Sequence, residues 1–175
     1  GGEPTLVPHF LEVCRTLSEG GVFLKIETNG QDFDPNRLRG LAVRSVQISL
    51  DGATQETYAK QRPGGVLAKA LQACRGVRAT GLPLEIAFAP TRLNIHEAAA
   101  VIDLALELGA FRFNTGQLMR LGTAAKLWGR LEPSADEYAD FRALLERREE
   151  ELSGRLELCY KPFSLDEELS ARRLE

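Results

Sequence analysis

The sequence alternates regularly between two kinds of segment, and this alternation restricts the chain to a small number of folds. Short stretches that read as strands are separated by stretches whose apolar residues recur at helical spacing. The strand-like stretches are VFLKIETNG, SVQISLDG, LPLEIAFAP and AFRFNTG, at residues 22–30, 45–52, 82–90 and 110–116. Strands that alternate with helices are typical of βαβ units with right-handed connections, so the sequence predicts an α/β fold built on a parallel sheet.

Capping signals mark where several of the intervening helices should begin. The predicted starts are Asn94 with Glu97, Ser134 with Glu137, and Asp34 with Pro35. The first two pairs have the spacing of a capping box, and the third is a cap followed by a first-turn proline. After Gly154, residues 155–160 are predicted to form a short fifth strand and residues 165–174 a closing helix.

Within the predicted strands, apolar and polar residues alternate. In the first strand Val22, Leu24 and Ile26 face one way, and polar residues face the other. A sheet covered by helices on both faces has strands that are apolar almost throughout, so the pattern favours a barrel or half-barrel with a polar interior. A two-layer sheet with one face open to solvent is the alternative. The polar residues expected to line the interior are Lys25, Glu27, Gln47, Glu85 and Arg112.

The composition excludes several classes of partner. The 175 residues carry a net charge of −3 with no basic stripe, which argues against a nucleic-acid-binding protein. No apolar run approaches the ~18 residues of a membrane span and nothing resembles a signal peptide, so we expect a soluble cytoplasmic protein without a membrane partner. The spacing of Cys14, Cys74 and Cys159 matches no metal or disulfide motif, and their apolar neighbours predict that all three are buried.

Small, polar and glycine-containing motifs stand at the carboxyl ends of the predicted strands, where parallel α/β barrels bind ligands. They are TNG, SLDG, APT and NTG, at residues 28–30, 49–52, 89–91 and 114–116. The opening GGEPT precedes the first predicted helix, so we expect it at a strand end too, with that strand upstream of residue 1. Each motif alone is also an ordinary turn, but as a set at one rim they predict a ligand site.

A family resemblance rests on these motifs in combination. The radical S-adenosylmethionine (radical SAM) enzymes carry similar strand-end motifs in succession, here GGEPTL, then TNG, then VQISLDGATQETY with a following Arg62. The stretch from Leu93 to Tyr138 further resembles the SPASM-like subgroup that matures peptides and peptide-derived cofactors. The resemblance covers most of the chain. It implies a partial (β/α)6 barrel of the TIM type, incomplete at its N-terminal strands.

The resemblance also implies roles for individual residues. Gly1, Gly2 and Glu3 would hold the methionine amino end of S-adenosylmethionine, through backbone oxygens and nearby polar atoms, and the Glu3 carboxylate is suited to an ammonium. Ser49 and Asp51 would lie near the ribose or the carboxylate of the cofactor. The remaining two predicted cofactor-binding residues are Asn29, which supports the cofactor or caps its own turn, and Arg62, which would pair with the cofactor carboxylate although Pro63 stands where the family usually has glycine.

The family's cluster-binding loop is not in this sequence. In radical SAM enzymes a CxxxCxxC loop before GGEP binds a [4Fe–4S] cluster, and no such spacing occurs here. We therefore expect a piece of a longer enzyme, inactive alone, with residues 1–153 as barrel core and 154–175 leading toward a C-terminal domain. In full length, the implied activity is reductive cleavage of S-adenosylmethionine to a 5′-deoxyadenosyl radical. The implied partners are a peptide or small-molecule substrate and an electron donor such as flavodoxin or ferredoxin.

Two other functions are consistent with the residues. A conventional aldolase-like or phosphate-binding barrel would use Lys25 as a Schiff-base amine or Gly64-Gly65 as a phosphate loop. A degenerate barrel retained as a peptide-binding scaffold would have no catalytic residues. Whatever the function, the strand at residues 22–28 is predicted to be an unpaired edge through which the chain alone would self-associate.

Overall fold

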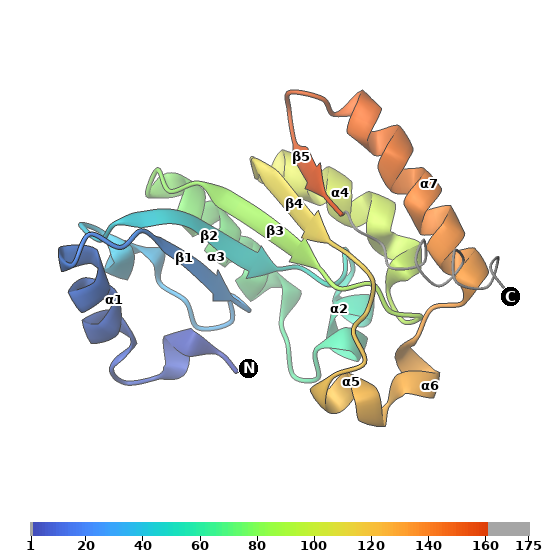
Figure 1. Ribbon diagram of the computed structural model, residues 1–175, viewed down its shortest axis with the longest axis horizontal. Helices are drawn as coiled ribbons and strands as arrows, with labels where there is room; N and C mark the ends of the chain where they lie inside the picture. Colours follow the sequence, from blue (N-terminus) through green and yellow to red (C-terminus); the bar gives the residue numbers. More distant parts are fainter. Residues whose placement is uncertain (1, 161–175) are drawn as a thin grey trace, which may run out of the picture.

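The protein is described by a computed structural model of residues 2–160, in which five strands form one parallel sheet (Figure 1). The strands are β1 (Leu24–Thr28), β2 (Val43–Ser49), β3 (Leu84–Phe88), β4 (Arg112–Thr115) and β5 (Glu157–Cys159). Their order in the sheet is β1-β2-β3-β4-β5, and every neighbouring pair is parallel. The predicted α/β fold with parallel strands in sequence order is therefore confirmed, and the predicted fifth strand is present.

Helices connect the strands. They are α1 (Phe10–Glu19), α2 (Gln55–Gln61), α3 (Leu67–Ala79), α4 (Ala98–Glu107), α5 (Gly122–Lys126), α6 (Trp128–Leu131) and α7 (Ala135–Glu151), with 3-10 turns η1 (Pro4–Leu6), η2 (Pro35–Leu38) and η3 (Ile95–Glu97). The capping box of Ser134 and Glu137 and the Asp34 cap are confirmed. The predicted helix at residues 165–174 lies outside the described residues. None of the helices within residues 2–160 has the length and apolar character needed to cross a membrane.

The helices pack on the apolar face of the sheet. Strand residues with no exposed surface, such as Ile48, Ile86 and Phe113, share one core cluster with residues of α1, α3, α4 and α7. Helix α3 contributes alanines and Cys74 to this core, so its backbone lies close to β2 and β3. Phe88 of β3 stacks on Phe113 at 6.2 Å and meets Phe141 of α7 at 6.0 Å between ring centroids. Burial of each such side chain contributes about 2 kcal/mol.

The opposite face carries polar residues, as predicted, but individual positions differ from expectation. Val22 is 45% exposed because the chain is still turning after α1, where the Val22 N–H donates to the Leu17 carbonyl and β1 has not begun. Cys159 is only partly buried because it alternates onto the polar face of β5, whereas Cys14 and Cys74 are buried as predicted. Glu85, predicted to line a wet cavity, is 1% exposed because other polar side chains cover it.

Strand β1 is an edge strand in the described part of the chain. It pairs only with β2 there, so one side of its backbone offers N–H and C=O groups to another strand. The exposed side chains of Lys25 and Glu27 project from one face of the sheet and do not block the edge. We expect the 175-residue chain alone to be marginally stable and to self-associate, which sedimentation at increasing concentration measures. A monomer at high concentration with freely exchanging β1 amides contradicts this expectation.

Candidate functional site

A pocket of about 410 Å³ lies at the carboxyl ends of β1 and β2. Its lining residues are Gly2, Glu3, Glu27, Thr28, Asn29, Ser49 and Arg62. Five of the seven residues predicted from the sequence are in this set. Of the other two, Asp51 is buried at the end of β2, and Gly1 lies outside the described residues. The structure therefore brings the predicted strand-end motifs to one rim, as parallel strands require.

Glu3 attaches the N-terminal segment to the end of β1. Its carboxylate accepts hydrogen bonds from the Asn29 N–H and the Thr28 hydroxyl, each at 2.7 Å, and from the N–H and hydroxyl of Thr5 at 3.2 and 2.7 Å. Burial raises the pKa of this carboxyl, but the hydrogen bonds from Asn29, Thr5 and Thr28 outweigh burial and lower it overall. Four internal donors on one carboxylate make Glu3 an anchor of the loop.

Glu3 is thus occupied by protein donors, and Glu27 is the other carboxylate of the pocket. The Glu27 side chain is 65% exposed, and its contact with Lys25 is long, at 4.0 Å. Beside it, Gly2 has a φ of 122°, a conformation that glycine adopts readily and other residues do not. The pocket therefore presents an available carboxylate next to glycine backbone, which suits an ammonium group. Glu27 was predicted only as a polar interior residue, and its position one residue before TNG is the signal that places it at this rim.

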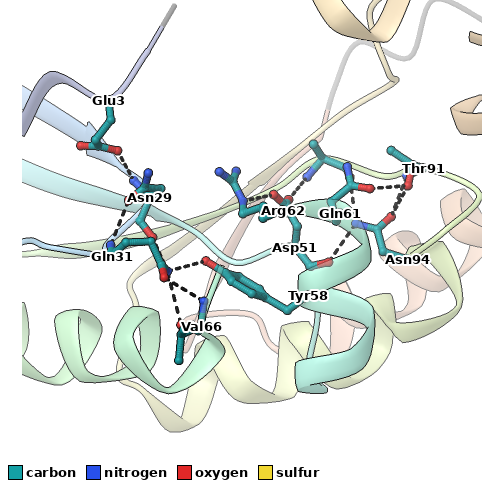
Figure 2. A network of polar contacts seen from close by, with 11 residues as sticks. Glu3, Asn29, Gln31, Asp51, Tyr58, Gln61, Arg62, Val66, Thr91 and Asn94 are labelled. Atoms are coloured by element: carbon teal, nitrogen blue, oxygen red, sulfur yellow. Dashed lines mark hydrogen bonds and ion pairs between the residues drawn. The ribbon is translucent and has the colours of Figure 1, made fainter. Parts of the chain in front are cut away.

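The turn after β1 is tied to the turn after α2. The Asn29 side chain accepts a hydrogen bond from the Gln31 N–H at 2.9 Å, so Asn29 caps its own turn. The Gln31 amide then donates to the Tyr58 hydroxyl at 3.1 Å and accepts from the Val66 N–H at 2.8 Å (Figure 2). Burial is the largest cause of the raised pKa of Tyr58, which stays a neutral phenol.

Asp51 and Arg62 form an ion pair at the centre of the same region (Figure 2). Arg62 Nε donates to Asp51 Oδ2 at 2.7 Å, and the backbone N–H of Ala89 donates to Asp51 Oδ1 at 2.9 Å. The Asp51 side chain is 3% exposed and that of Arg62 is 32% exposed. Asp51 therefore links the end of β2 to Arg62 at the end of α2 and to Ala89 after β3, without lining the pocket itself.

Four further residues connect these loops, and of these only Thr91, in the APT motif, was placed at the rim by sequence reasoning. Asn94 donates to the backbone oxygens of Asp51 and Ala89 at 3.0 and 3.1 Å. The Glu97 carboxylate accepts from the backbone N–H groups of residues 53 and 54 and from the hydroxyls of residues 54 and 57. The other two are Thr91 and Gln61, which are hydrogen-bonded to each other at 2.9 Å.

The predicted capping box of Asn94 and Glu97 is therefore wrong. Neither side chain makes a capping hydrogen bond to its own helix. Both bond instead to the turn after β2, more than 40 positions away in sequence. In the sequence, Asn94 and Glu97 are polar residues at capping spacing after the strand-end motif APT. The same local pattern serves a helix cap or contacts to a distant turn, and only the tertiary fold distinguishes the two.

A polar cluster around the buried Glu85 lies on the polar face of the sheet. Lys25 Nζ donates to Glu85 Oε2 at 2.8 Å, and Asn114 Nδ2 donates to Glu85 Oε2 at 2.7 Å and to Gln47 Oε1 at 2.9 Å. Burial raises the pKa of the Glu85 carboxyl, but hydrogen bonds from Lys25, Ser45 and Asn114 outweigh it and lower the pKa overall. Lys25 is thus ion-paired, which does not suit the Schiff-base amine of the aldolase alternative.

A second and larger pocket, of about 1160 Å³, opens at the carboxyl ends of β3 and β4. Because these strands follow β1 and β2 in the sheet, both pockets lie along one rim. The segment between β4 and α5 carries Met119 and Leu121, which are 70% and 66% exposed, and Arg120 stacks over Trp128 at 5.8 Å. The pocket therefore combines apolar, aromatic and charged groups, as binding sites for organic ligands do.

A parallel half-barrel with charged pockets at the carboxyl ends of its strands is the architecture of a ligand-binding α/β barrel. The profile of the Radical SAM superfamily matches residues 1–105, which is more than half of the chain. The chain belongs to the radical SAM superfamily. The resemblance stated from the motifs is confirmed at this level.

The chain is also similar to curated proteins named as a peptide cyclase and as a mycofactocin maturase. It is 32% identical over 166 residues to the PqqA peptide cyclase of Rhodopseudomonas palustris, covering 91% of this chain and 44% of that protein. It is 33% identical over 159 residues to the mycofactocin maturase MftC of Mycobacterium ulcerans, covering 88% of this chain and 43% of that protein. The chain thus spans less than half the length of these relatives.

Solved structures share the fold. The crystal structure of Streptococcus suis SuiB bound to S-adenosylmethionine superposes with a TM-score of 0.75 at 17% identity, over 93% of this chain and 38% of SuiB. SuiB bound to its precursor peptide SuiA gives a TM-score of 0.74 over the same 93% of this chain and 37% of that one. At this identity the likeness concerns the partial barrel fold.

Proposed function

We propose that the full-length protein is a radical SAM enzyme that modifies a peptide or a peptide-derived cofactor. The observation that carries this proposal is the pocket at the ends of β1 and β2, where an arginine and an available carboxylate flank glycine backbone. This arrangement suits a zwitterionic amino-acid group such as the methionine end of S-adenosylmethionine. The relatives support the chemical class, because they include a peptide cyclase and a mycofactocin maturase.

The residues of the pocket fit the methionine end of S-adenosylmethionine. The Arg62 guanidinium retains two terminal nitrogens with no partner within residues 2–160, and they can pair with a carboxylate in a charge-assisted contact. Glu27 and the Gly2 backbone would accept from the ammonium group, while Ser49 offers a hydroxyl at the end of β2. When bound, the cofactor supplies a 5′-deoxyadenosyl radical for hydrogen abstraction. The chain's own part is to bind, orient and enclose it.

The described residues do not fit a [4Fe–4S] cluster. No group of three His, Cys, Asp or Glu side chains within residues 2–160 is arranged to hold a metal ion. We propose that other parts of the full-length protein ligate the cluster, that residues 1–153 form the barrel core and that residues 154–175 lead toward a C-terminal domain. A flavodoxin or ferredoxin as electron donor and a cytoplasmic location belong to the same proposal.

The larger pocket is the proposed place for the substrate. It lies beside the cofactor pocket on the rim, and its exposed Met119 and Leu121 suit apolar side chains of a peptide. A side chain bound there would lie on the same rim of the sheet as the cofactor pocket.

Anaerobic turnover of the full-length protein tests the proposal. We expect the reduced protein to bind S-adenosylmethionine and to release 5′-deoxyadenosine, detected by chromatography and mass spectrometry. Glu27→Gln should weaken binding because the amide carries no charge to attract the ammonium group. The control is Glu19→Gln, which neutralises an exposed carboxylate of α1 that does not line the pocket. Full-length protein that binds no S-adenosylmethionine contradicts the proposal and favours the scaffold alternative.

A further inference from the structure

Asp51 is a buried carboxylate whose two oxygens both have protein donors. Its side chain is 3% exposed, Oδ1 accepts from the Ala89 N–H, and Oδ2 accepts from Arg62 Nε. A buried carboxylate with both oxygens bonded has little capacity left for a ligand. Asp51 does not line the pocket although it stands two residues after Ser49, which does. Any effect of Asp51 on the pocket therefore passes through a neighbour.

The neighbour in reach of the pocket is Arg62. Its Nε is directed at Asp51, and Figure 2 shows its terminal nitrogens pointing away from Asp51, on the side where Asn29 and Glu3 lie. The Arg62 side chain is 32% exposed and lines the pocket. One edge of the guanidinium is thus fixed internally, while the other remains available.

The loop after β3 fixes this ion pair from two sides. Ala89 donates to the Asp51 carboxylate, and Asn94 donates to the backbone oxygens of both Asp51 and Ala89. Asn94 also accepts from the Thr91 N–H at 2.7 Å, and the Thr91 hydroxyl donates to Gln61, the residue before Arg62. The Asp51 carboxylate and the side chain of Gln61 next to the arginine are therefore both attached to the loop after β3. An arginine held in this way loses little conformational freedom when a ligand binds.

We propose that Asp51 is a positioning residue that aims the Arg62 guanidinium at the carboxylate of the bound cofactor. The inference rests on the proposed function and assigns Asp51 a role different from the cofactor contact that the motif suggested. Without Asp51, the guanidinium retains its charge but loses its fixed orientation. The affinity for ligands that carry the carboxylate then falls, and the affinity for ligands that lack it does not.

Two ligands separate this role from a structural one. We would measure dissociation constants of S-adenosylmethionine and of its decarboxylated analogue for full-length wild type, Asp51→Asn, Arg62→Gln and the double variant. Asp51→Asn preserves shape and still accepts from Ala89, but its amide cannot hold Arg62. We expect it to weaken S-adenosylmethionine binding about tenfold, the size of one charge-assisted hydrogen bond, and to leave binding of the analogue unchanged.

The double variant provides the decisive comparison. If Asp51 acts through Arg62, Asp51→Asn adds no further loss in the Arg62→Gln background. Equal weakening of both ligands, or losses that add in the double variant, overturns the proposal. If Asp51→Asn does not fold, Arg62→Gln alone still tests the proposal. An equal loss of affinity for both ligands in that variant would show that Arg62 does not contact the cofactor carboxylate, and this result overturns the proposal. Wild type that binds neither ligand refutes the proposed function itself, which is a different result.

Discussion

Glu3→Ala should weaken S-adenosylmethionine binding to the full-length protein about a hundredfold, because the two hydrogen bonds to a charged group that hold the N-terminal segment to Thr28 and Asn29 are lost. The Glu3 carboxylate accepts from Thr28 at the end of β1, from Asn29 in the turn after it and from Thr5 in its own segment. Without it, the segment that carries Gly2 is no longer attached to the rim. The measurement is equilibrium binding, with cluster content determined in parallel.

Two control variants separate anchoring from charge. Thr5→Val removes one of the four donors, the hydroxyl, but keeps the backbone N–H of residue 5 and the bonds from Thr28 and Asn29, so its effect should be much smaller. Glu19→Gln neutralises an exposed carboxylate at the end of α1 and should change nothing. An unchanged affinity in Glu3→Ala would show that the segment is held by its packing alone.

The contribution of Glu3 to the stability of the fold should also depend on pH, and the lowered pKa fixes the direction. The pKa of Glu3 in the folded protein lies below its ordinary value of 4.5, so the ionised carboxylate stabilises the fold. That contribution is fully present above pH 4.5 and is lost as the pH falls through the lowered pKa of the folded state. The difference in unfolding free energy between wild type and Glu3→Gln should therefore shrink in acid. A difference that does not depend on pH contradicts this assignment.

The fold could be predicted from the sequence because the signals for its strands and helices come from residues close together in the chain. Alternation of polar and apolar residues identified four strands and their buried faces, and glycines marked the ends of the helices between them. The errors fall at boundaries. Val22 was assigned to β1, but the turn after α1 keeps its backbone bonded to Leu17.

The interior of the site could be predicted less well, because burial of a charge depends on partners that are distant in sequence. Asp51 was predicted to lie near the cofactor and Glu85 to line a polar interior, yet each is buried. Glu85 is buried because Lys25, 60 positions away, and Asn114 cover and bond to it. The Asn94 and Glu97 pair shows the same limit, since a local capping pattern was used for long-range contacts.

Lys25→Met should lower the free energy of unfolding at neutral pH by about 2 kcal/mol, because it leaves the Glu85 carboxylate buried without its cation. The effect is smaller than for a fully buried pair because the Lys25 side chain is 40% exposed, whereas that of Glu85 is 2% exposed. Denaturant unfolding of the full-length protein measures the change. The matched control is Lys60→Met, which breaks the exposed pair with Glu56 and should change the free energy of unfolding much less.

The pH dependence of the destabilisation by Lys25→Met would identify the buried Glu85 carboxylate as its cause. In the wild type, hydrogen bonds from Lys25, Ser45 and Asn114 keep the pKa of Glu85 below 4.5 although burial raises it, so the pair stabilises the fold above that pH and loses this effect in acid. In Lys25→Met the effect of burial remains and the pKa of Glu85 rises. Protonation then relieves the penalty, and the difference from wild type should shrink as the pH falls.

A second substitution completes the test. Lys25→Met with Glu85→Gln removes the buried charge while the amide oxygen can still accept from Asn114, so part of the lost stability should return at neutral pH. Lys25→Arg keeps a cation and should stay close to wild type. If Lys25→Met alone is as stable as wild type, the ion pair does not stabilise the fold.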